Sequence, residues 1–213
     1  MNGNIEKPAA YPSLAGRSIF ITGGASGIGA SLVEHFSSQG CKVAFADLAE
    51  EAGRTLADQI RARGGTAPHF IPCDLRDIDR LRDAIAEAAK VNGAIGVLCN
   101  NAGNDDRHRS EDVTAAYWDD RMAVNLRPQF FAAQAVRPGM ARAGGGSIIN
   151  LGSIVVSMAA ADCVAYVAAK AGVYGMTRAL AREFGPDRIR VNCLVPGWVM
   201  TERQVKLWLD EEG

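Results

Sequence analysis

Residues 18–29 read SIFITGGASGIG, and this stretch decides the prediction of the fold. Its first five residues are mostly apolar and β-branched, which is typical of a strand buried on both faces of a sheet. The glycines that follow permit a tight turn, and a helix that opens at Gly27 presents backbone N–H groups at its positive end. Such a turn can bind the pyrophosphate of a dinucleotide, or can merely pack a helix against a strand. Its position between a strand and a helix favours the dinucleotide site, with contacts expected from Gly23, Ser26, Gly27, Ile28 and Gly29.

The same alternation of strand and helix patterns continues along the chain. Short, continuous apolar runs predict strands of a parallel sheet at Ser18–Thr22, Lys42–Ala46, Ala67–Pro72, Ile95–Asn100, Ser147–Leu151 and Arg190–Val195. Stretches rich in Ala, Leu, Arg and Glu predict helices at Ile28–Gln39, Glu50–Arg63, Ile78–Val91, Ala115–Ala143 (interrupted near Pro128) and Asp162–Phe184. This alternation predicts an α/β fold, a Rossmann-type doubly wound parallel sheet in a three-layer αβα arrangement. Because no linker or repeat interrupts it, we expect residues 1–213 to form a single dinucleotide-binding and catalytic domain.

Composition and charge exclude several classes of protein. The 213 residues are 48% hydrophobic with a formal net charge of −1, so no basic field attracts nucleic acid or an anionic membrane. No apolar run approaches the roughly 20 residues that span a bilayer, and residues 1–17 lack the apolar stretch of a signal peptide. The five cysteines include no CxxC pair. They predict free thiols in a reducing compartment, the cytoplasm, and no metal site.

Residues that follow the next predicted strands extend the cofactor site, because ligands of such a sheet bind at the carboxyl ends of its strands. The carboxylate of Asp47 can accept hydrogen bonds from both hydroxyls of an adenosine ribose and would repel a 2′-phosphate, so NAD is favoured over NADP. The N-cap of the next helix is the alternative role for Asp47. Further cofactor contacts are expected from Leu48, from Asp74 and Leu75 at the adenine edge, and from the compact turn Asn101, Ala102 and Gly103.

A candidate catalytic group follows the fifth predicted strand. Tyr166 and Lys170 are one helical turn apart and share a face of their helix. A nearby ammonium lowers the pKa of a tyrosine, which ordinarily titrates near pH ~10, and a lowered pKa suits a base at neutral pH. Ser153 lies at the same end of the sheet, where its hydroxyl can bond to a substrate oxygen and to the phenol. The amide of Asn125 can hold a water that links Lys170 to solvent, or can satisfy the backbone of the interrupted helix.

Together these motifs resemble the short-chain dehydrogenase/reductase family over about residues 13–204. They stand in the family's order: TGGASGIG at 22–29, Asp74, NNAG at 100–103, Asn125, Ser153, YVAAK at 166–170, then Pro196-Gly197 and Thr201. The resemblance implies that Tyr166 removes a hydroxyl proton while a hydride passes to the nicotinamide, and that Ser153 orients the hydroxyl. It implies that Lys170 holds the nicotinamide ribose and that Asn125 supports a proton relay. The carboxamide end of the cofactor is expected to contact Pro196, Gly197, Val199 and Thr201.

The substrate should lie against the turns above the cofactor, where the first turn, residues 104–108, reads NDDRH and is strongly polar. Such a loop suits a substrate rich in hydroxyl groups, although a solvated loop has the same composition. NNAG followed by NDDRH is similar to the NAD-dependent aldose dehydrogenases of the D-xylose 1-dehydrogenase group. This implies an oxidoreductase that transfers hydride from the C1 hydroxyl of a sugar to NAD, giving an aldonolactone. The substrate contacts expected are Asn104, Asp105, Ser153 and Tyr166.

Two other functions stay open. The same fold can act on another secondary alcohol or ketone, such as a 3-oxoacyl thioester, although an acyl chain would favour a less polar mouth. The chain can also be a non-catalytic dinucleotide-binding protein. A hydrolase is excluded, because no Gly-x-Ser-x-Gly elbow surrounds Ser153 and the three histidines have no evident nucleophile beside them.

The C-terminal end departs from the family pattern. Family members continue into a further helix and a final strand, whereas this sequence ends at Gly213. We therefore expect the sheet to lack its final strand and the domain to be incomplete relative to the family. Family members commonly associate through the helices that here contain Asn125 and Tyr166, which implies a homo-oligomer, either a dimer or a tetramer.

Overall fold

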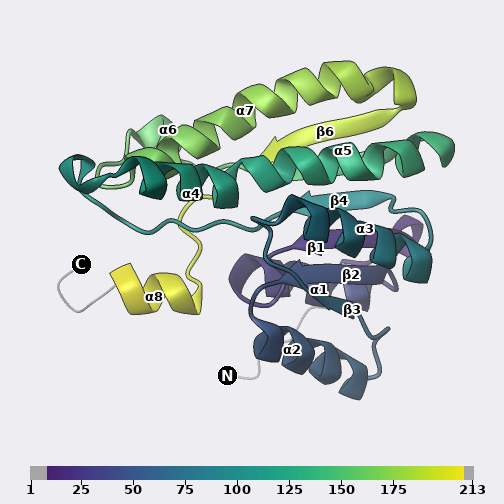
Figure 1. Cartoon of the computed structure of the whole chain (residues 1–213). Helices are drawn as coiled ribbons and strands as arrows, with labels where there is room; N and C mark the ends of the chain where they lie inside the picture. Colours follow the sequence, from purple (N-terminus) through teal and green to yellow (C-terminus); the bar gives the residue numbers. More distant parts are fainter. Residues whose placement is uncertain (1–8, 209–213) are drawn as a thin grey trace.

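A central sheet of six parallel strands organises the molecule in the computed structural model, which describes residues 9–208 (Figure 1). Every neighbouring pair of strands runs parallel. The order across the sheet is β3-β2-β1-β4-β5-β6. The strands are β1 (Ser18–Thr22), β2 (Lys42–Asp47), β3 (His69–Pro72), β4 (Val97–Asn100), β5 (Gly146–Leu151) and β6 (Ile189–Leu194). All six predicted strands are confirmed, with ends that differ from the prediction by at most two residues.

The strand order reverses between β1 and β4. The chain builds β1, β2 and β3 outward in one direction, then returns to place β4 on the other side of β1. The carboxyl ends of β1 and β4 lie side by side at this point, where Thr22 of β1 is the register partner of Asn100 of β4. In doubly wound sheets such a reversal opens a crevice in which ligands bind. The fold therefore brings together the turn after β1 and the turn after β4.

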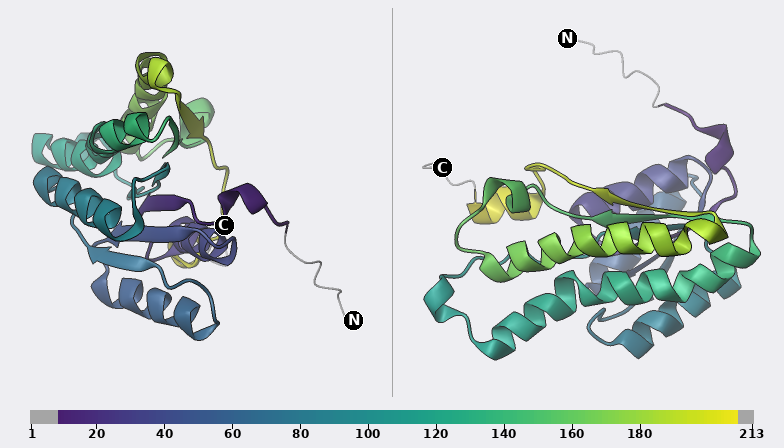
Figure 2. Two further views of the ribbon diagram at one scale, coloured as in Figure 1. Left: turned by 90° about the vertical axis from the view of Figure 1, so that its right-hand side faces the viewer. Right: turned by 90° about the horizontal axis from the view of Figure 1, so that it is seen from above.

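Helices cover both faces of the sheet and form the predicted three layers (Figures 1 and 2). One face carries the cluster of buried residues supplied in part by α1 and α2, and the other carries the cluster supplied in part by α3, α5 and α7. The bounds are α1 (Gly27–Ser38), α2 (Glu50–Ala62), α3 (Ile78–Asn92), α5 (Arg127–Arg142) and α7 (Val164–Phe184).

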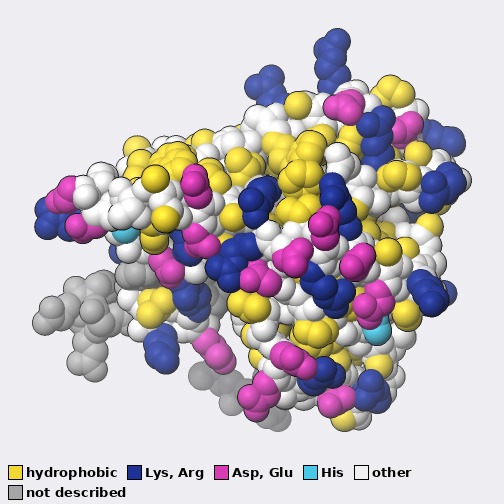
Figure 3. Space-filling model, viewed as in Figure 1, with side chains coloured by type: hydrophobic (Ala, Val, Ile, Leu, Met, Phe, Trp, Pro, Cys, Tyr) yellow, Lys and Arg dark blue, Asp and Glu magenta, His cyan; other side chains and the backbone are white. Residues whose placement is uncertain are grey.

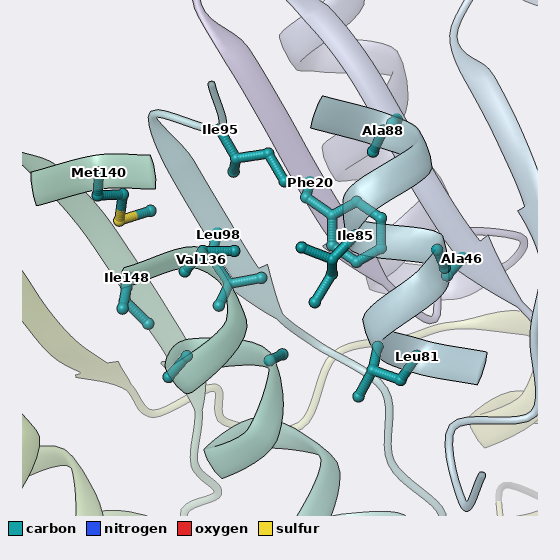
Figure 4. Packing of buried hydrophobic residues seen from close by; sticks show 14 of the residues in the cluster. Phe20, Ala46, Leu81, Ile85, Ala88, Ile95, Leu98, Val136, Met140 and Ile148 are labelled. Carbon is teal, nitrogen blue, oxygen red and sulfur yellow. The ribbon is translucent and has the colours of Figure 1, made fainter. Parts of the chain in front are cut away.

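The larger cluster forms the main hydrophobic core (Figure 4). Phe20, Leu98 and Ile148 come from three different strands and are completely buried. They share this cluster with Ile85 of α3 and Val136 of α5. Each buried side chain of this size contributes about 1.5–3 kcal/mol relative to the exposed state. The continuous apolar runs in the sequence therefore correspond to strands that are covered from both sides.

The long helix expected at residues 115–143 is divided, as the sequence predicts. It forms α4 (Ala115–Asn125) and α5 (Arg127–Arg142), with Leu126 between them at φ −122° and ψ −54°. Pro128 lies at the start of α5, where its missing N–H costs nothing and its ring prevents a continuous helix. The break places Asn125 at the last position of α4.

Five short helical segments were not predicted from the sequence pattern. They are the 3₁₀ turns η1 (Pro12–Leu14), η2 (Ser110–Asp112) and η3 (Gly185–Asp187), and the helices α6 (Val155–Met158) and α8 (Glu202–Trp208). They are too short for hydrophobic periodicity to reveal them. The last of them, α8, lies apart from the sheet in Figure 1 and near the carboxyl ends of its strands.

The surface carries charges of both signs. In Figure 3 acidic and basic side chains are interspersed over the visible face, in agreement with the net charge of −1. Among residues 9–208, no helix has both the length and the apolar composition needed to cross a bilayer.

Candidate functional site

The turn after β4 is bonded directly to the turn after β1. Asn101 donates from its side-chain Nδ2 to the carbonyl oxygens of Gly23 (2.8 Å) and Thr22 (3.2 Å). Its backbone N–H donates to Thr22 Oγ1 at 3.1 Å. An added Cβ on Gly23 would lie 2.7 Å from Cα of Ala102, and Gly23 has φ +68°, so this position requires glycine. The two motifs that the sequence assigned to the cofactor thus form one continuous backbone surface.

The start of α1 suits an anion. Gly29 lies so close to the preceding turn that an added Cβ would be 1.8 Å from the carbonyl oxygen of Gly23. Ser26 occupies the N-cap position without a side-chain capping hydrogen bond, so its hydroxyl is available to a ligand. Backbone N–H groups at a helix N-terminus favour negative charge. This set of donors fits the diphosphate of a dinucleotide.

Asp47, at the end of β2, is held between two stretches of backbone. Its Oδ2 accepts a hydrogen bond from the N–H of Ala25, and its Oδ1 accepts one from Ala49, both at 2.9 Å. The N-cap of α2 is Ala49, so the alternative role of Asp47 as the cap is wrong. Each carboxylate oxygen keeps a lone pair for a further donor. Asp47 thus fits a pair of ribose hydroxyls beside the exposed Leu48.

Asp74 already has a strong protein partner. Arg76 donates to it from Nη2 at 2.6 Å and from Nε at 3.0 and 3.1 Å. Hydrogen bonding from Arg76 holds the pKa of Asp74 below its ordinary value. The side chain of the neighbouring Leu75 packs against the core. Contacts of these two residues with an adenine edge stay a prediction.

Ser153, Tyr166 and Lys170 lie together at the carboxyl edge of the sheet. Ser153 follows β5, and the other two side chains come from α7. Lys170 is 2% exposed, donates from Nζ to the carbonyl oxygen of Leu151 at 2.8 Å, and lies 5.5 Å from the centroid of the Tyr166 ring. An added Cβ on Gly103 would be 3.4 Å from Nζ of Lys170. The fold therefore brings the catalytic candidates against the turn that follows β4.

Burial controls the pKa values of this group. It raises the pKa of Tyr166 to about 12; a hydrogen bond with Ser153 acts in the opposite direction, and the charge of Asp105 adds to the rise. Burial also lowers the pKa of Lys170 to about 8. The sequence predicted a lowered pKa for Tyr166. The direction in the structure is opposite, because the phenol is largely removed from water and the nearby ammonium donates to a backbone carbonyl instead.

Asn125 holds the polar loop in place. Its Oδ1 accepts from the N–H of Asn104 at 2.8 Å, and its Nδ2 donates to the carbonyl oxygens of Asn104 (3.1 Å) and Arg121 (3.0 Å). Asn125 therefore donates both amide protons to backbone carbonyl oxygens. The contact with Arg121 satisfies the last turn of α4, which is the second of the two roles that the sequence left open. One lone pair of Oδ1 remains for a water, so the proton relay stays a prediction.

The two substrate candidates on the loop make different contacts. Asn104 Oδ1 accepts from the N–H of Asp106 at 2.8 Å, which closes a local turn. Asp105 extends toward α8, where Gln204 Nε2 donates to its Oδ2 at 2.6 Å and Arg203 Nε donates to its Oδ1 at 3.3 Å. Arg203 and Gln204 were not predicted from the sequence. The sole local signal was that Asp105 and Arg203 carry opposite charges and that each lies next to a site motif. Nothing in the sequence pattern indicated that the two residues form a pair.

The segment between β6 and α8 crosses the site. The N–H of Ile154, beside Ser153, donates to the carbonyl oxygen of Pro196 at 3.2 Å. An added Cβ on Gly27 would contact Thr201 Cγ2 at 3.3 Å. Gly197 and Val199 lie between these points and are exposed. The segment that the sequence assigned to the carboxamide end of the cofactor therefore runs from the catalytic edge to the glycine turn.

Comparisons with known proteins agree on one family. Residues 17–212 match the family model described as short chain dehydrogenase. The curated protein named "Probable galactose dehydrogenase GalD" from Rhizobium meliloti is 50% identical over 95% of this chain and 79% of its own length. A D-xylose 1-dehydrogenase from Caulobacter vibrioides is 52% identical over 96% of this chain and 80% of its own length.

A solved structure supports the same assignment. The crystal structure of a short chain dehydrogenase from Mycobacterium smegmatis superimposes with a TM-score of 0.83 at 27% identity. The match covers 88% of this chain and 79% of that chain. Sequence and fold comparisons thus point to the same class of protein.

Proposed function

This chain belongs to the short-chain dehydrogenase family, and from that premise we propose that it oxidises the C1 hydroxyl of an aldose with NAD, giving an aldonolactone. The observation that carries the proposal is the placement of Ser153, Tyr166 and Lys170 beside a polar loop on the edge that carries the glycine turn. Two relatives at about half identity are named as a galactose and a D-xylose dehydrogenase. Their names support an aldose as the substrate.

The proposed cofactor site uses the turns at the crevice. The glycine turn and the N-terminus of α1 hold the diphosphate, and Asp47 accepts from the adenosine ribose. Asp74 and Leu75 border the adenine, while the backbone of residues 101–103 and the segment 196–201 border the nicotinamide half. When bound, the nicotinamide supplies the hydride acceptor.

The proposed proton chemistry belongs to the catalytic group. Tyr166, ionised to the phenolate by loss of its own proton toward solvent, accepts the proton of the sugar hydroxyl, and Ser153 holds that hydroxyl by a hydrogen bond and steadies the developing carbonyl oxygen. Lys170 positions the nicotinamide ribose and stabilises the phenolate. Asn125 supports the passage of the proton toward solvent, and Asn104 and Asp105 contact other sugar hydroxyls.

The preference for NAD rests on the charge of Asp47. A 2′-phosphate would meet this carboxylate at the end of β2, and the repulsion favours the cofactor without the phosphate. We expect Asp47→Ala to lower the ratio of kcat/KM with NAD to kcat/KM with NADP by roughly fivefold or more, since one avoided close charge repulsion is worth about 1 kcal/mol or more. An unchanged ratio would mean that Asp47 serves only the backbone of Ala25 and Ala49.

We also propose that the enzyme lies in the cytoplasm and that it forms a homo-oligomer. Cys41, Cys73, Cys99 and Cys163 are buried free thiols and Cys193 is half-buried, which suits a reducing compartment. The proposed contacts between subunits involve α7, which carries Tyr166, and the helix expected to contain Asn125, which the structure divides into α4 and α5.

The decisive experiment measures formation of reduced nicotinamide with NAD or NADP against a panel of aldoses, simple secondary alcohols and a hydroxyacyl thioester. Turnover confined to aldoses with NAD is the expected result, and the ranking of pentoses and hexoses names the sugar. Turnover only with the other alcohols would refute the aldose assignment while leaving the chemistry in place. Nucleotide binding without any turnover would favour the non-catalytic role over both enzymatic ones.

A further inference from the structure

The helix α8 is bonded to the loop that carries Asp105 and Asp106. Arg203 donates from Nη2 to Asp106 at 2.6 Å and from Nε to Asp105 at 3.3 Å, and Gln204 donates to Asp105 at 2.6 Å. The partners are 97 to 99 residues apart in the sequence. These contacts connect α8, at the end of the segment that crosses the site after β6, to the 104–106 loop on the opposite side of the site.

Asp105 and Asp106 differ in the side chains that they contact besides those of α8. Asp106 also accepts from Arg121 Nη1 at 3.2 Å, and the side chain of Arg121 is only 10% exposed. Arg121 in turn pairs with Asp120, and Asp120 pairs with Arg76. Asp106 is therefore anchored to α4 independently of α8. The position and charge balance of Asp105 depend more directly on Arg203 and Gln204.

Asp105 follows directly after Asn104, whose backbone is bonded to Asn125, and its charge reaches the catalytic candidates. Its charge acts on both Tyr166 and Lys170. The other titratable groups that face this pair are Cys163 at the start of α7 and Cys193 on β6. The charges of Arg107 and Asp162 also reach Cys163. Arg203 is a cation bonded directly to the Asp105 carboxylate.

We propose that Arg203 and Gln204 are positioning residues that dock α8 on the 104–106 loop and set the negative charge that Asp105 presents to Tyr166. A carboxylate near a phenolate disfavours the ionised phenol, and an ion pair that neutralises the carboxylate reduces this penalty. The Arg203 and Asp105 side chains are 46% and 29% exposed, so water screens the pair and the effect is modest. The inference rests on the proposed role of Tyr166 as the base.

The first test is the pH dependence of kcat for oxidation in Arg203→Gln, using whichever alcohol or aldose of the panel turns over. The unpaired carboxylate should move the acidic limb of the profile to higher pH by about 0.2–0.7 unit, the size expected for a partly exposed ion pair. Arg203→Lys should keep most of the original profile. Lys206→Gln, which removes the same charge from the same helix, should leave the limb in place.

The double variant Arg203→Gln with Asp105→Asn separates charge from structure. Removal of the Asp105 carboxylate should return the acidic limb of the kcat profile to the wild-type pH or to a lower pH, even if KM rises. If α8 acts only as structural support, Arg203→Gln will raise KM equally at every pH and leave the limb unmoved, which overturns the electrostatic role. Equal shifts in Arg203→Gln and Lys206→Gln would overturn it as well.

A second readout does not need turnover. Trypsin cleaves after Lys206 when α8 unfolds locally, so Gln204→Ala, which removes the bond to Asp105, should increase the rate of this cleavage several-fold. Val205→Ala, at an exposed position of the same helix, should not. Equal rates would overturn the docking. Tyr166→Phe, assayed in parallel, distinguishes the two levels: retained turnover refutes the proposed base and this inference with it. An inactive Tyr166→Phe with an unmoved limb in Arg203→Gln refutes this inference alone.

Discussion

At the scale of single residues, the proposed chemistry depends on two ionisable side chains that burial drives toward their neutral forms. The phenol of Tyr166 is harder to ionise than a free tyrosine, and the ammonium of Lys170 loses its proton more easily than a free lysine. The desolvation that causes both shifts also strengthens any charge interaction inside the site. A proton acceptor at this position is therefore sensitive to each nearby charge, including that of Asp105.

Tyr166→Phe tests the acceptor itself. The change removes one hydroxyl and leaves the ring, so nucleotide binding measured by fluorescence titration should stay within about twofold of the wild type. The value of kcat should fall by at least 10²-fold, the usual contribution of a general acid or base. Turnover close to the wild-type rate would show that another group accepts the proton.

The burial of Lys170 predicts how the free energy of unfolding changes with pH. Its pKa is about 8 in the folded protein, because burial disfavours the ammonium, against 10.5 ordinarily. Between these values the unfolded chain binds more protons than the folded one, so this lysine's cost to stability is largest below pH 8 and diminishes as the pH rises. The free energy of urea unfolding of the wild type relative to Lys170→Met should rise by about 2 kcal/mol from pH 7.5 to pH 10. A constant difference would mean that the lysine is not desolvated.

At the scale of elements, the turn between β1 and α1 is defined by contacts that exclude any side chain. Gly29→Ala would place a methyl group 1.8 Å from the carbonyl oxygen of Gly23 and 2.7 Å from Asn101 Nδ2. The turn must open, so we expect nucleotide binding to be lost and stability to fall by about 1–3 kcal/mol. Gly139→Ala on α5 is the matched control, because nothing lies within 4 Å of its added Cβ, and it should stabilise the helix by about 0.5–1 kcal/mol. Similar effects of the two changes in urea unfolding and nucleotide titration would contradict this account.

The other decisive element is the break between α4 and α5. Pro128 and the conformation of Leu126 end one helix and begin the next, and Asn125 is thereby free to bond the backbone of the polar loop. An added Cβ on Gly172 of α7 would lie 2.9 Å from Leu126 Cδ2. Gly172 thus packs closely against the Leu126 side chain within the chain.

At the scale of the whole molecule, α7 carries part of the proposed contact surface for a second subunit. Gly175 is exposed, and nothing lies within 4 Å of an added Cβ there. Gly175→Arg should therefore leave the fold of one subunit intact while obstructing close helix contact between subunits. Light scattering after gel filtration should show a lower mass than the wild type, and Ala52→Arg on the exposed face of α2 should not change it. An unchanged mass for Gly175→Arg would exclude an interface at this position.

The sequence by itself determined the strands, the main helices, the doubly wound parallel α/β class and the family that the site motifs indicated. These features follow from local rules: continuous apolar runs make strands buried on both faces, glycine is the residue that fits the turn before α1, and a spacing of four places Tyr166 and Lys170 on one helix face. The comparisons with known proteins confirm the family that these motifs indicated.

Only the tertiary structure decided which side chains meet. Arg203 and Asp105 are 98 residues apart, and no local pattern pairs one charge with another across the mouth of a site. The direction of the Tyr166 pKa also depended on the fold, because desolvation is set by everything that packs around the phenol, whereas the sequence shows only the lysine one turn away. Periodicity and spacing report the neighbours along the chain; burial and long-range ion pairs depend on neighbours in space.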